Sequence, residues 1–207
     1  MRLRYDNNAI DKLNASNYLI KYNDQKIKLN TKTVVEIGMG KGEMLVEMAN
    51  YCRDKQFIGL EKYATVAAKC IKKADEYKLT NFSILLADAS KIDEIFTGQC
   101  DEIWLTFSDP WPKARHEKRR LTHSLFLNKY KLILSNDGIL KIKTDNDDFY
   151  NYSLESLQNN NWEIIVCGND LHSSKFNAYN FQTGYEKKWS SKGKNINFIF
   201  ARKTNNN

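Results

Sequence analysis

The sequence predicts an α/β fold with a doubly wound, mostly parallel sheet. From residue 33 onward, apolar runs of strand length alternate with segments of helical periodicity, a pattern typical of such sheets. Both prolines fall within 110–112, so no Pro/Gly-rich linker divides the chain. We therefore expect one domain over residues 31–203, preceded by a short basic N-terminal arm (1–30) and followed by a disordered tail (204–207).

The expected elements follow the hydrophobic pattern in chain order. Strands are predicted at 33–37, 57–60, 83–86, 102–107, 139–143, 162–167 and 197–201. Helices are predicted at 42–52, 64–77, 122–134 and 147–157, with a short irregular helix after residue 86. Residues 135–138, which read Ser-Asn-Asp-Gly, are expected to stop the third long helix. Ligands of such sheets bind beyond the carboxyl ends of the strands, so the residues that follow each strand are the candidates for a site.

The charge of the chain is distributed unevenly. The 207 residues carry a formal net charge of +7, but segments 2–28, 111–120 and 187–203 together carry +13, which leaves the rest of the chain acidic. A basic frame around an acidic body favours a polyanionic partner. Clustered charge that serves only solubility is the alternative.

Several classes of protein are disfavoured by composition. None of the four cysteines forms a CxxC pair, and there are only three histidines, so we expect no metal site and no disulfide framework. The cysteines are expected to be small core residues. The N-terminus lacks the apolar segment of a signal peptide, and every apolar run is far shorter than the ~20 residues of a membrane span. We expect a cytoplasmic protein with no membrane contact.

A glycine-rich turn follows the first predicted strand. Its glycines, Gly38, Gly40 and Gly42, have the spacing GxGxG, whereas a pyrophosphate site is expected to have GxGxxG. The preceding Glu36 would repel a phosphate but suit a cationic ligand, such as the sulfonium and ammonium groups of S-adenosylmethionine. A nicotinamide dinucleotide site and a purely structural turn are the alternatives at this point.

Acidic residues also follow the next two strands. Glu61 comes 23 residues after Gly38, where a carboxylate would accept the ribose hydroxyls of a nucleoside. Asp88 follows the third strand and could accept from an adenine amino group. Each acid alone could be a solvated carboxylate or a helix cap. Three acids after three successive strands instead describe a nucleoside without phosphate, which favours S-adenosylmethionine over a dinucleotide.

The fourth strand leads into a proline-flanked loop and a basic run. The two prolines on either side of Trp111 stiffen the loop, which would hold Asp109 at the mouth of the site. Residues 113–120 contain five Lys and Arg, which suit contacts with phosphate. A Pro-Trp turn packed on the core and a solvated charged helix are the corresponding structural alternatives.

These motifs together resemble the bacterial tRNA (guanine-N7)-methyltransferase family over nearly the whole chain. The most specific piece is 108–113 with 115–121, supported by 36–42, 143–146, 170–172 and 183–186. The resemblance implies a class I, Rossmann-like methyltransferase sheet of seven strands with the last strand antiparallel. It also implies S-adenosylmethionine as cofactor, S-adenosylhomocysteine as its product, tRNA as partner and guanine 46 of the variable loop as target.

The resemblance also implies roles for individual residues, which we carry over by motif. Cofactor contacts are expected at Glu36, Gly38, Gly40, Gly42, Glu61, Asp88 and Asp109. Asp109 is in addition the expected catalytic residue. Substrate contacts are expected at Lys113, Asp145, Thr183, Gly184, Tyr185 and Glu186. RNA contacts are expected at Arg115, His116, Glu117, Lys118, Arg119 and Arg120.

Three questions remain open from the sequence. Either Asp109 or Asp145 could hold the Watson–Crick edge of guanine, and the chain could be a monomer or a homodimer. A small-molecule methyltransferase, a non-catalytic RNA-binding protein and a nicotinamide-dependent dehydrogenase are rival functions. The basic frame, the set of strand-end acids and the GxGxG spacing disfavour them in that order.

Overall fold

The computed structural model describes residues 5–23 and 25–204 of the chain and is built around a seven-stranded sheet. The strand order is β4-β3-β2-β6-β7-β9-β8. The strands are β2 (Thr33–Ile37), β3 (Gln56–Glu61), β4 (Phe82–Leu86), β6 (Cys100–Thr106), β7 (Leu134–Thr144), β8 (Trp162–Gly168) and β9 (Asn197–Lys203). The first five of these run parallel, and β9 is antiparallel to both β7 and β8. The predicted fold class is confirmed, including the antiparallel last strand.

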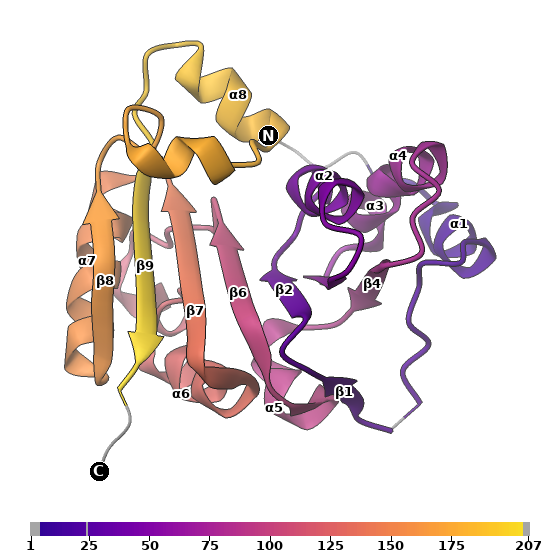
Figure 1. Ribbon diagram of the computed structural model, residues 1–207, viewed down its shortest axis with the longest axis horizontal. Helices are drawn as coiled ribbons and strands as arrows, with labels where there is room; N and C mark the ends of the chain where they lie inside the picture. The colour runs from indigo at the N-terminus through magenta and orange to yellow at the C-terminus, as the bar shows by residue number, and fades with distance from the viewer. Residues whose placement is uncertain (1–4, 24, 205–207) are drawn as a thin grey trace.

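Helices cover both faces of this sheet (Figure 1). The α-helices are α1 (Ala9–Ala15), α2 (Glu43–Tyr51), α3 (Ala64–Ala67), α4 (Ile71–Glu76), α5 (Ile92–Ile95), α6 (Ser124–Ile133), α7 (Asp147–Asn159) and α8 (Gly184–Ser190). Alternate residues of β2 belong to different cores, because successive side chains of a strand point to opposite faces. Val34 packs in the cluster of α2, whereas Val35 and Ile37 pack in the cluster of α6.

The N-terminal segment 1–30, expected to be a basic arm, is folded onto the domain wherever it is described. Helix α1 buries Ala9 and Leu13, and Leu19 forms a parallel bridge to Ile84 at the edge strand β4. The short strand β1 (Ile27–Leu29) then pairs in parallel with β5 (Phe96–Gly98) as a separate two-stranded sheet. Residues 1–4 and 24 of the expected arm, and 205–207 of the expected tail, lie outside the described residues.

The expected helix stop at 135–138 is wrong. The backbone of Leu134 is already extended, and Leu134 pairs with Cys100, so 135–138 belong to the long strand β7. The Gly138 backbone lies close against the Leu134 side chain, and a Cβ at position 138 would come within 2.8 Å of it. This close contact explains the glycine. The predicted helix 64–77 is likewise divided by a 3₁₀ turn, η1 (Ala68–Cys70), between α3 and α4.

The expectation for the cysteines holds for two of the four. Cys70 and Cys100 are buried, whereas Cys52 is half-buried and Cys167 is exposed. All four are free thiols. Within 5–23 and 25–204, the structure contains no helix with the length and apolar character that crossing a membrane requires.

Candidate functional site

A cleft of about 740 Å³ opens at the carboxyl ends of the parallel strands, where strand order reverses between β2 and β6. Its walls bring together four of the predicted cofactor contacts, Gly38, Glu61, Asp88 and Asp109. Two predicted RNA contacts, Lys118 and Arg119, line it too. The four cofactor contacts lie at the ends of four different strands, so the topology of the sheet assembles them. A doubly wound sheet binds its ligands at this position.

The glycine-rich turn borders the cleft at Gly38, whereas Gly40 and Gly42, which we also expected to contact the cofactor, are not among the residues that line it. Gly38, Gly40 and Gly42 all have left-handed backbones, with φ of 75°, 57° and 63°. Side chains would strain this backbone, and a Cβ on Gly42 would lie only 3.1 Å from Cys70. Gly42 is also the residue from which α2 begins. The turn therefore needs glycine both for its conformation and for its contact with the next helical layer.

Glu61 is fixed in place by backbone donors. Its Oε2 accepts a hydrogen bond from the Gly40 N–H (2.9 Å), and its Oε1 accepts from the N–H groups of Lys62 (2.8 Å) and Tyr63 (2.9 Å). A carboxylate offers about four acceptor positions. Capacity thus remains for a hydroxyl group in the cleft, and the orientation of the carboxylate is already set by the turn.

Asp88 is an ionised acceptor at the rim. Its carboxylate accepts from the Ser90 N–H (2.9 Å) and from Lys62 Nζ (2.9 Å). These hydrogen bonds, the one from Ser90 first, lower the pKa of Asp88 from 3.8 to about 2. The group therefore carries its charge at neutral pH.

The loop of Asp109 is strained at both ends. Phe107 and Trp111 have φ of 51° and 43°, a left-handed conformation that bulky residues rarely adopt. Each such residue costs of order 1–3 kcal/mol and persists only where its surroundings hold it. Arg120 supplies part of that hold, since its Nε donates to the Pro110 carbonyl (3.1 Å) and its Nη2 to the Trp111 carbonyl (3.1 Å). Asp109 is exposed and faces the cleft.

In the basic segment beyond this loop, some residues contact the loop and the others are exposed to solvent. Arg120 holds the loop through the hydrogen bonds above, and its guanidinium carbon lies 4.1 Å from the centre of the Tyr152 ring. The His116 ring packs edge-on against Trp111, with 5.5 Å between the ring centres. The 3₁₀ helix η3 (Ala114–Arg119) leaves its remaining charged side chains in solvent, with Arg119 over the Trp111 ring at 4.9 Å. Those exposed residues are Arg115, Glu117, Lys118 and Arg119, and the preceding Lys113 is exposed as well.

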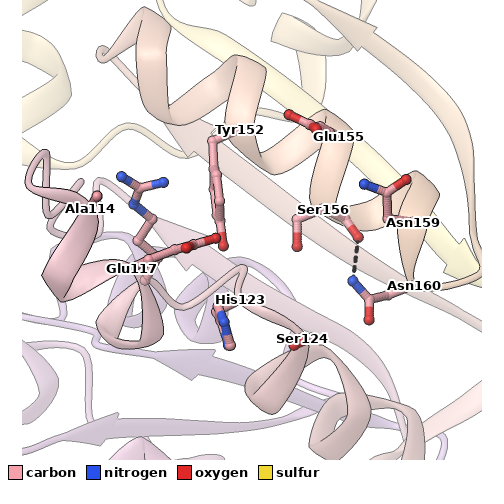
Figure 2. A pocket seen from close by; sticks show the side chains of 10 residues that line it. Ala114, Glu117, His123, Ser124, Tyr152, Glu155, Ser156, Asn159 and Asn160 are labelled. Carbon is pink, nitrogen blue, oxygen red and sulfur yellow. Dashed lines mark hydrogen bonds between the residues drawn. The ribbon is translucent and has the colours of Figure 1, made fainter.

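Behind η3 lies a second hollow, of about 400 Å³, against helix α7. Figure 2 shows Tyr152 projecting into it from α7, with Glu117 and His123 nearby. Its ionisable lining includes two acids, Glu117 and Glu155. These two acids give the hollow negative charge, in contrast to the positive charge of the basic segment.

Glu36 does not line the cleft. Ile37 points into the cleft, and strand alternation turns Glu36 to the opposite face, where its side chain is fully buried. Its carboxyl is hydrogen-bonded to the Thr106 hydroxyl, and burial raises its pKa from 4.5 to about 7. A direct contact with a ligand in the cleft is not available to Glu36 in this conformation.

Hydrogen bonds within the segment and to helix α2 hold the predicted substrate segment 183–186 in place. Thr183 Oγ1 accepts from the Glu186 N–H (3.0 Å) and caps α8, and the Gly184 N–H donates to Glu43 (2.6 Å). At the surface, the Tyr185 hydroxyl donates to Asp145 Oδ2 (3.0 Å). The Tyr185 ring lies 5.1 Å from that of Phe107, a residue of the cleft wall.

Glu186 itself lies in the interior. Its carboxylate binds Lys143 Nζ (2.8 Å), His172 Nε2 (2.8 Å) and Asn180 Nδ2 (2.6 Å), and the Lys143 and Glu186 side chains are both fully buried. Burial is the largest single influence and would raise the pKa of Glu186, but the charge of Lys143 and the hydrogen bonds from Lys143, Asn180 and His172 together outweigh it, so the pKa is lowered. Burial lowers the pKa of Lys143. Glu186 thus positions the segment and does not face the cleft.

Lys143 begins the motif 143–146, but the sequence assigns it no role in the site. Its ammonium also binds Asn180 Oδ1 (2.9 Å) and the Phe181 carbonyl (3.0 Å), so it holds the chain on both sides of Thr183. The sequence does place a lysine at the end of the predicted apolar strand 139–143. A lysine at such a position is either exposed at the edge of the sheet or paired with a buried partner. Among the described residues, no three His, Cys, Asp or Glu lie close enough together to hold a metal ion.

Comparisons with known proteins show the fold and the family of this chain. A family model described as "Putative methyltransferase" matches residues 30–199. A 16S rRNA methyltransferase, KamB, superimposes with a TM-score of 0.64 at 10% identity, covering 98% of this chain and 95% of KamB. The antibiotic-resistance methyltransferase Kmr gives a TM-score of 0.58 at 13% identity, covering 96% and 92%. The chain therefore has the fold of class I, S-adenosylmethionine-dependent methyltransferases and matches a methyltransferase family model.

Similarity of sequence narrows this class. The tRNA (guanine-N(7)-)-methyltransferase of Mycoplasmopsis agalactiae is 69% identical over 203 residues, which cover 98% of this chain and 99% of the relative. The enzyme of the same description from Mycoplasmopsis synoviae is 50% identical over 207 residues and the full length of both chains. The chain belongs to the tRNA (guanine-N7)-methyltransferase family.

Proposed function

We propose that this chain transfers the methyl group of S-adenosylmethionine to N7 of a guanine in tRNA, at variable-loop position 46 by family resemblance. The products are N7-methylguanosine and S-adenosylhomocysteine. The observation that carries the proposal is one cleft bordered by the strand-end carboxylates Glu61, Asp88 and Asp109 and by the basic helix η3. Full-length identity of 69% to a tRNA (guanine-N(7)-)-methyltransferase supports the choice of substrate.

The residues of the cleft fit the cofactor. Glu61 has acceptor capacity for ribose hydroxyls, and the ionised Asp88 can accept from the adenine amino group. A Cβ on Gly40 would meet nothing within 4 Å, so the turn leaves open space beside the Glu61 carboxylate. When bound, S-adenosylmethionine supplies an electrophilic methyl group on a sulfonium. We propose that no metal takes part.

The chain's own contribution to the reaction is placement. Guanine N7 has an in-plane lone pair and loses no proton when its bond to the methyl carbon forms, so no general base is required. The C–S bond breaks as the N–C bond forms, and the purine ring takes up the positive charge. Alignment of the reacting atoms can contribute several kcal/mol, up to ~7–11. The base must first leave its stack in the RNA, at a cost of a few kcal/mol.

We assign the guanine edge to Asp109. It is exposed in the cleft, whereas Asp145 lies outside the cleft wall and accepts from Tyr185. A carboxylate there can accept from N1–H and the 2-amino group, which distinguishes guanine from adenine. Its charge also stabilises the cation that methylation creates. In this proposal Asp145, Tyr185 and the capped α8 shape the approach of the nucleotide, and Lys113, Arg115, Lys118 and Arg119 bind phosphates.

The proposal is tested by identifying the methylated base. The full chain is incubated with radiolabelled S-adenosylmethionine and bulk tRNA lacking N7-methylguanosine, and the tRNA is digested to nucleosides. We expect the label in 7-methylguanosine alone. Label in another nucleoside, or none in the tRNA, would show that the proposed function is wrong. Heat-denatured protein is the control for chemical methylation.

A further inference from the structure

A third hollow, of about 310 Å³, lies between the start of α2, the helical segment η1–α4 and the start of α8. It shares no lining residue with the cofactor cleft. Four lysines line it, from the glycine-rich turn (Lys41), the η1–α4 segment (Lys69, Lys73) and α8 (Lys187). We call this hollow the lysine groove. Three of these lysines lie outside the basic segments recognised in the sequence.

Both acids of the lysine groove make contacts within the protein, but only Glu47 is paired with a cation. Glu43 accepts from the Gly184 N–H (2.6 Å). Glu47 pairs with Lys73 (3.0 Å) and accepts from the Tyr77 hydroxyl (3.1 Å). These contacts engage both carboxylates that line the groove.

The other lysines keep their charge for a ligand. Lys41, Lys69 and Lys187 are exposed, and none has a carboxylate within 4.0 Å in the part of the chain that the structure describes. Three cations from three separate elements thus converge on one concave surface, where four lysines stand against two glutamates, Glu43 and Glu47, a net charge of 4 − 2 = +2. Ion pairing within the described residues does not account for the positions of Lys41, Lys69 and Lys187.

We propose that the lysine groove binds the phosphodiester backbone of tRNA. Ammonium groups on flexible stems act as point charges for phosphates, and their contacts release counterions from the nucleic acid. The inference rests on the proposed function, because Gly184 and Lys187 of the groove belong to the same helix as Tyr185. An RNA that reaches Tyr185 therefore extends along the groove.

The hollow of Figure 2 provides an internal contrast. It is similar in size, about 400 Å³, but Glu117 and Glu155 line it, and its one arginine, Arg120, already donates to the carbonyls of the Asp109 loop. Two glutamates against one arginine give this lining a net charge of 1 − 2 = −1, which disfavours a phosphate backbone. Size alone thus does not distinguish the two hollows, whereas the sign of the uncompensated charge does.

The experiment compares two double variants of the full chain. Lys69→Gln/Lys187→Gln removes two groove cations, and Lys32→Gln/Lys78→Gln removes two exposed lysines that precede β2 and β4 at the opposite edge of the sheet. The Kd for unmodified tRNA is measured from 50 to 300 mM KCl, together with the KM for S-adenosylmethionine. Circular dichroism confirms that each variant is folded.

For the groove variant we expect roughly tenfold weaker tRNA binding and a plot of log K against log salt that is less steep by about 1.4–1.8. The KM for S-adenosylmethionine should stay at its wild-type value, and the control should bind tRNA like wild type. Wild-type affinity and slope in the groove variant, or an equal loss in the control, would overturn the inference. Wild-type protein that neither binds nor methylates tRNA would instead refute the proposed function.

Discussion

Two groups of acids lie near the carboxyl ends of the sheet and differ in what they face. Glu61, Asp88 and Asp109 border the open cleft, whereas Glu36 and Glu186 are fully buried near Lys143. The first group keeps acceptor capacity on the side of the cleft, whereas the second is enclosed in the protein. There Glu186 is bound by Lys143, and Glu36 accepts from Thr106 through Oε1 while its Oε2 has no partner among the described residues. Acids at this end of the sheet thus have two kinds of environment: those at or beyond the end of a strand stay open to the cleft, whereas Glu36 within β2 and Glu186 within α8 are enclosed by the protein.

The difference has a geometric cause. A residue before the end of a strand points to one face or the other by alternation, and one step along β2 separates the cleft residue Ile37 from the buried Glu36. Buried acids need partners, and here they find Thr106 and Lys143. We therefore expect the buried group to govern stability and placement, and the open group to govern binding and turnover. The following predictions separate these roles.

The largest effect is expected at the buried ion pair. Lys143→Met leaves the Glu186 carboxylate buried without its counter-charge, which typically lowers the free energy of unfolding by about 3–5 kcal/mol. The double variant Lys143→Met/Glu186→Gln should recover part of this loss, because it removes the stranded charge as well. Urea unfolding followed by circular dichroism measures both. A loss below about 1 kcal/mol in the single variant would contradict the buried role.

In the open group, Asp109→Asn should leave stability near wild type and lower kcat/KM. We expect a loss of about 10²–10³-fold, the range found when one electrostatic contact to a transition state is removed. Asp145→Asn is the matched control, since Asp145 accepts from Tyr185 outside the cleft wall and should lose less. Initial rates of methyl transfer to tRNA give kcat/KM for both variants. Equal losses in both variants would refute the assignment of the guanine edge to Asp109.

The pH dependence of stability should report on Glu36. Burial raises its pKa in the folded protein from 4.5 to about 7, so the folded state holds this proton more tightly than the unfolded chain. Its stabilising contribution is complete below pH 4.5 and is lost as the pH rises through 7, by about 3 kcal/mol. Urea unfolding between pH 5 and 8 should show this slope in wild type and a flatter one in Glu36→Gln. Parallel profiles would exclude Glu36 as its source.

The smallest effect is expected at the rim of the cleft. Lys62→Met removes the exposed partner of Asp88, and surface ion pairs contribute little to stability. The free energy of unfolding should not change measurably. The pKa of the Asp88 carboxyl should rise from about 2 but stay below 3.8, because the Ser90 N–H still donates to it. Carboxyl NMR titration measures this shift, and an unchanged pKa would show that Lys62 has no influence.

The open group could be found from the sequence because each member depends on local context. Gly38 and Gly40 mark a left-handed turn, and Glu61 and Asp88 each follow an apolar strand. Alternating strands and helices then require their carboxyl ends to meet at one edge. Local chemistry and topology were sufficient for these residues and for the order of the main elements.

The buried group required the fold. Lys143 and Glu186 are 43 residues apart, and nothing near either one indicates the other. The position of Glu36 depends on strand alternation, and the start of β7 at Leu134 depends on pairing with Cys100 that overrides a local stop signal. Long-range partners decide such cases, and a single sequence does not display them. The lysine groove could not be predicted from the sequence for the same reason, because its lysines come from three separate segments of the chain.

The central claim is that the cleft directs methyl transfer to N7 of guanine in tRNA. The most direct measurement uses two transcripts of one tRNA, made with guanosine or with 7-deazaguanosine, in which carbon replaces N7. We predict methyl incorporation into the guanosine transcript and none into the 7-deazaguanosine transcript, with similar Kd values for both. Equal incorporation into both transcripts would contradict the account.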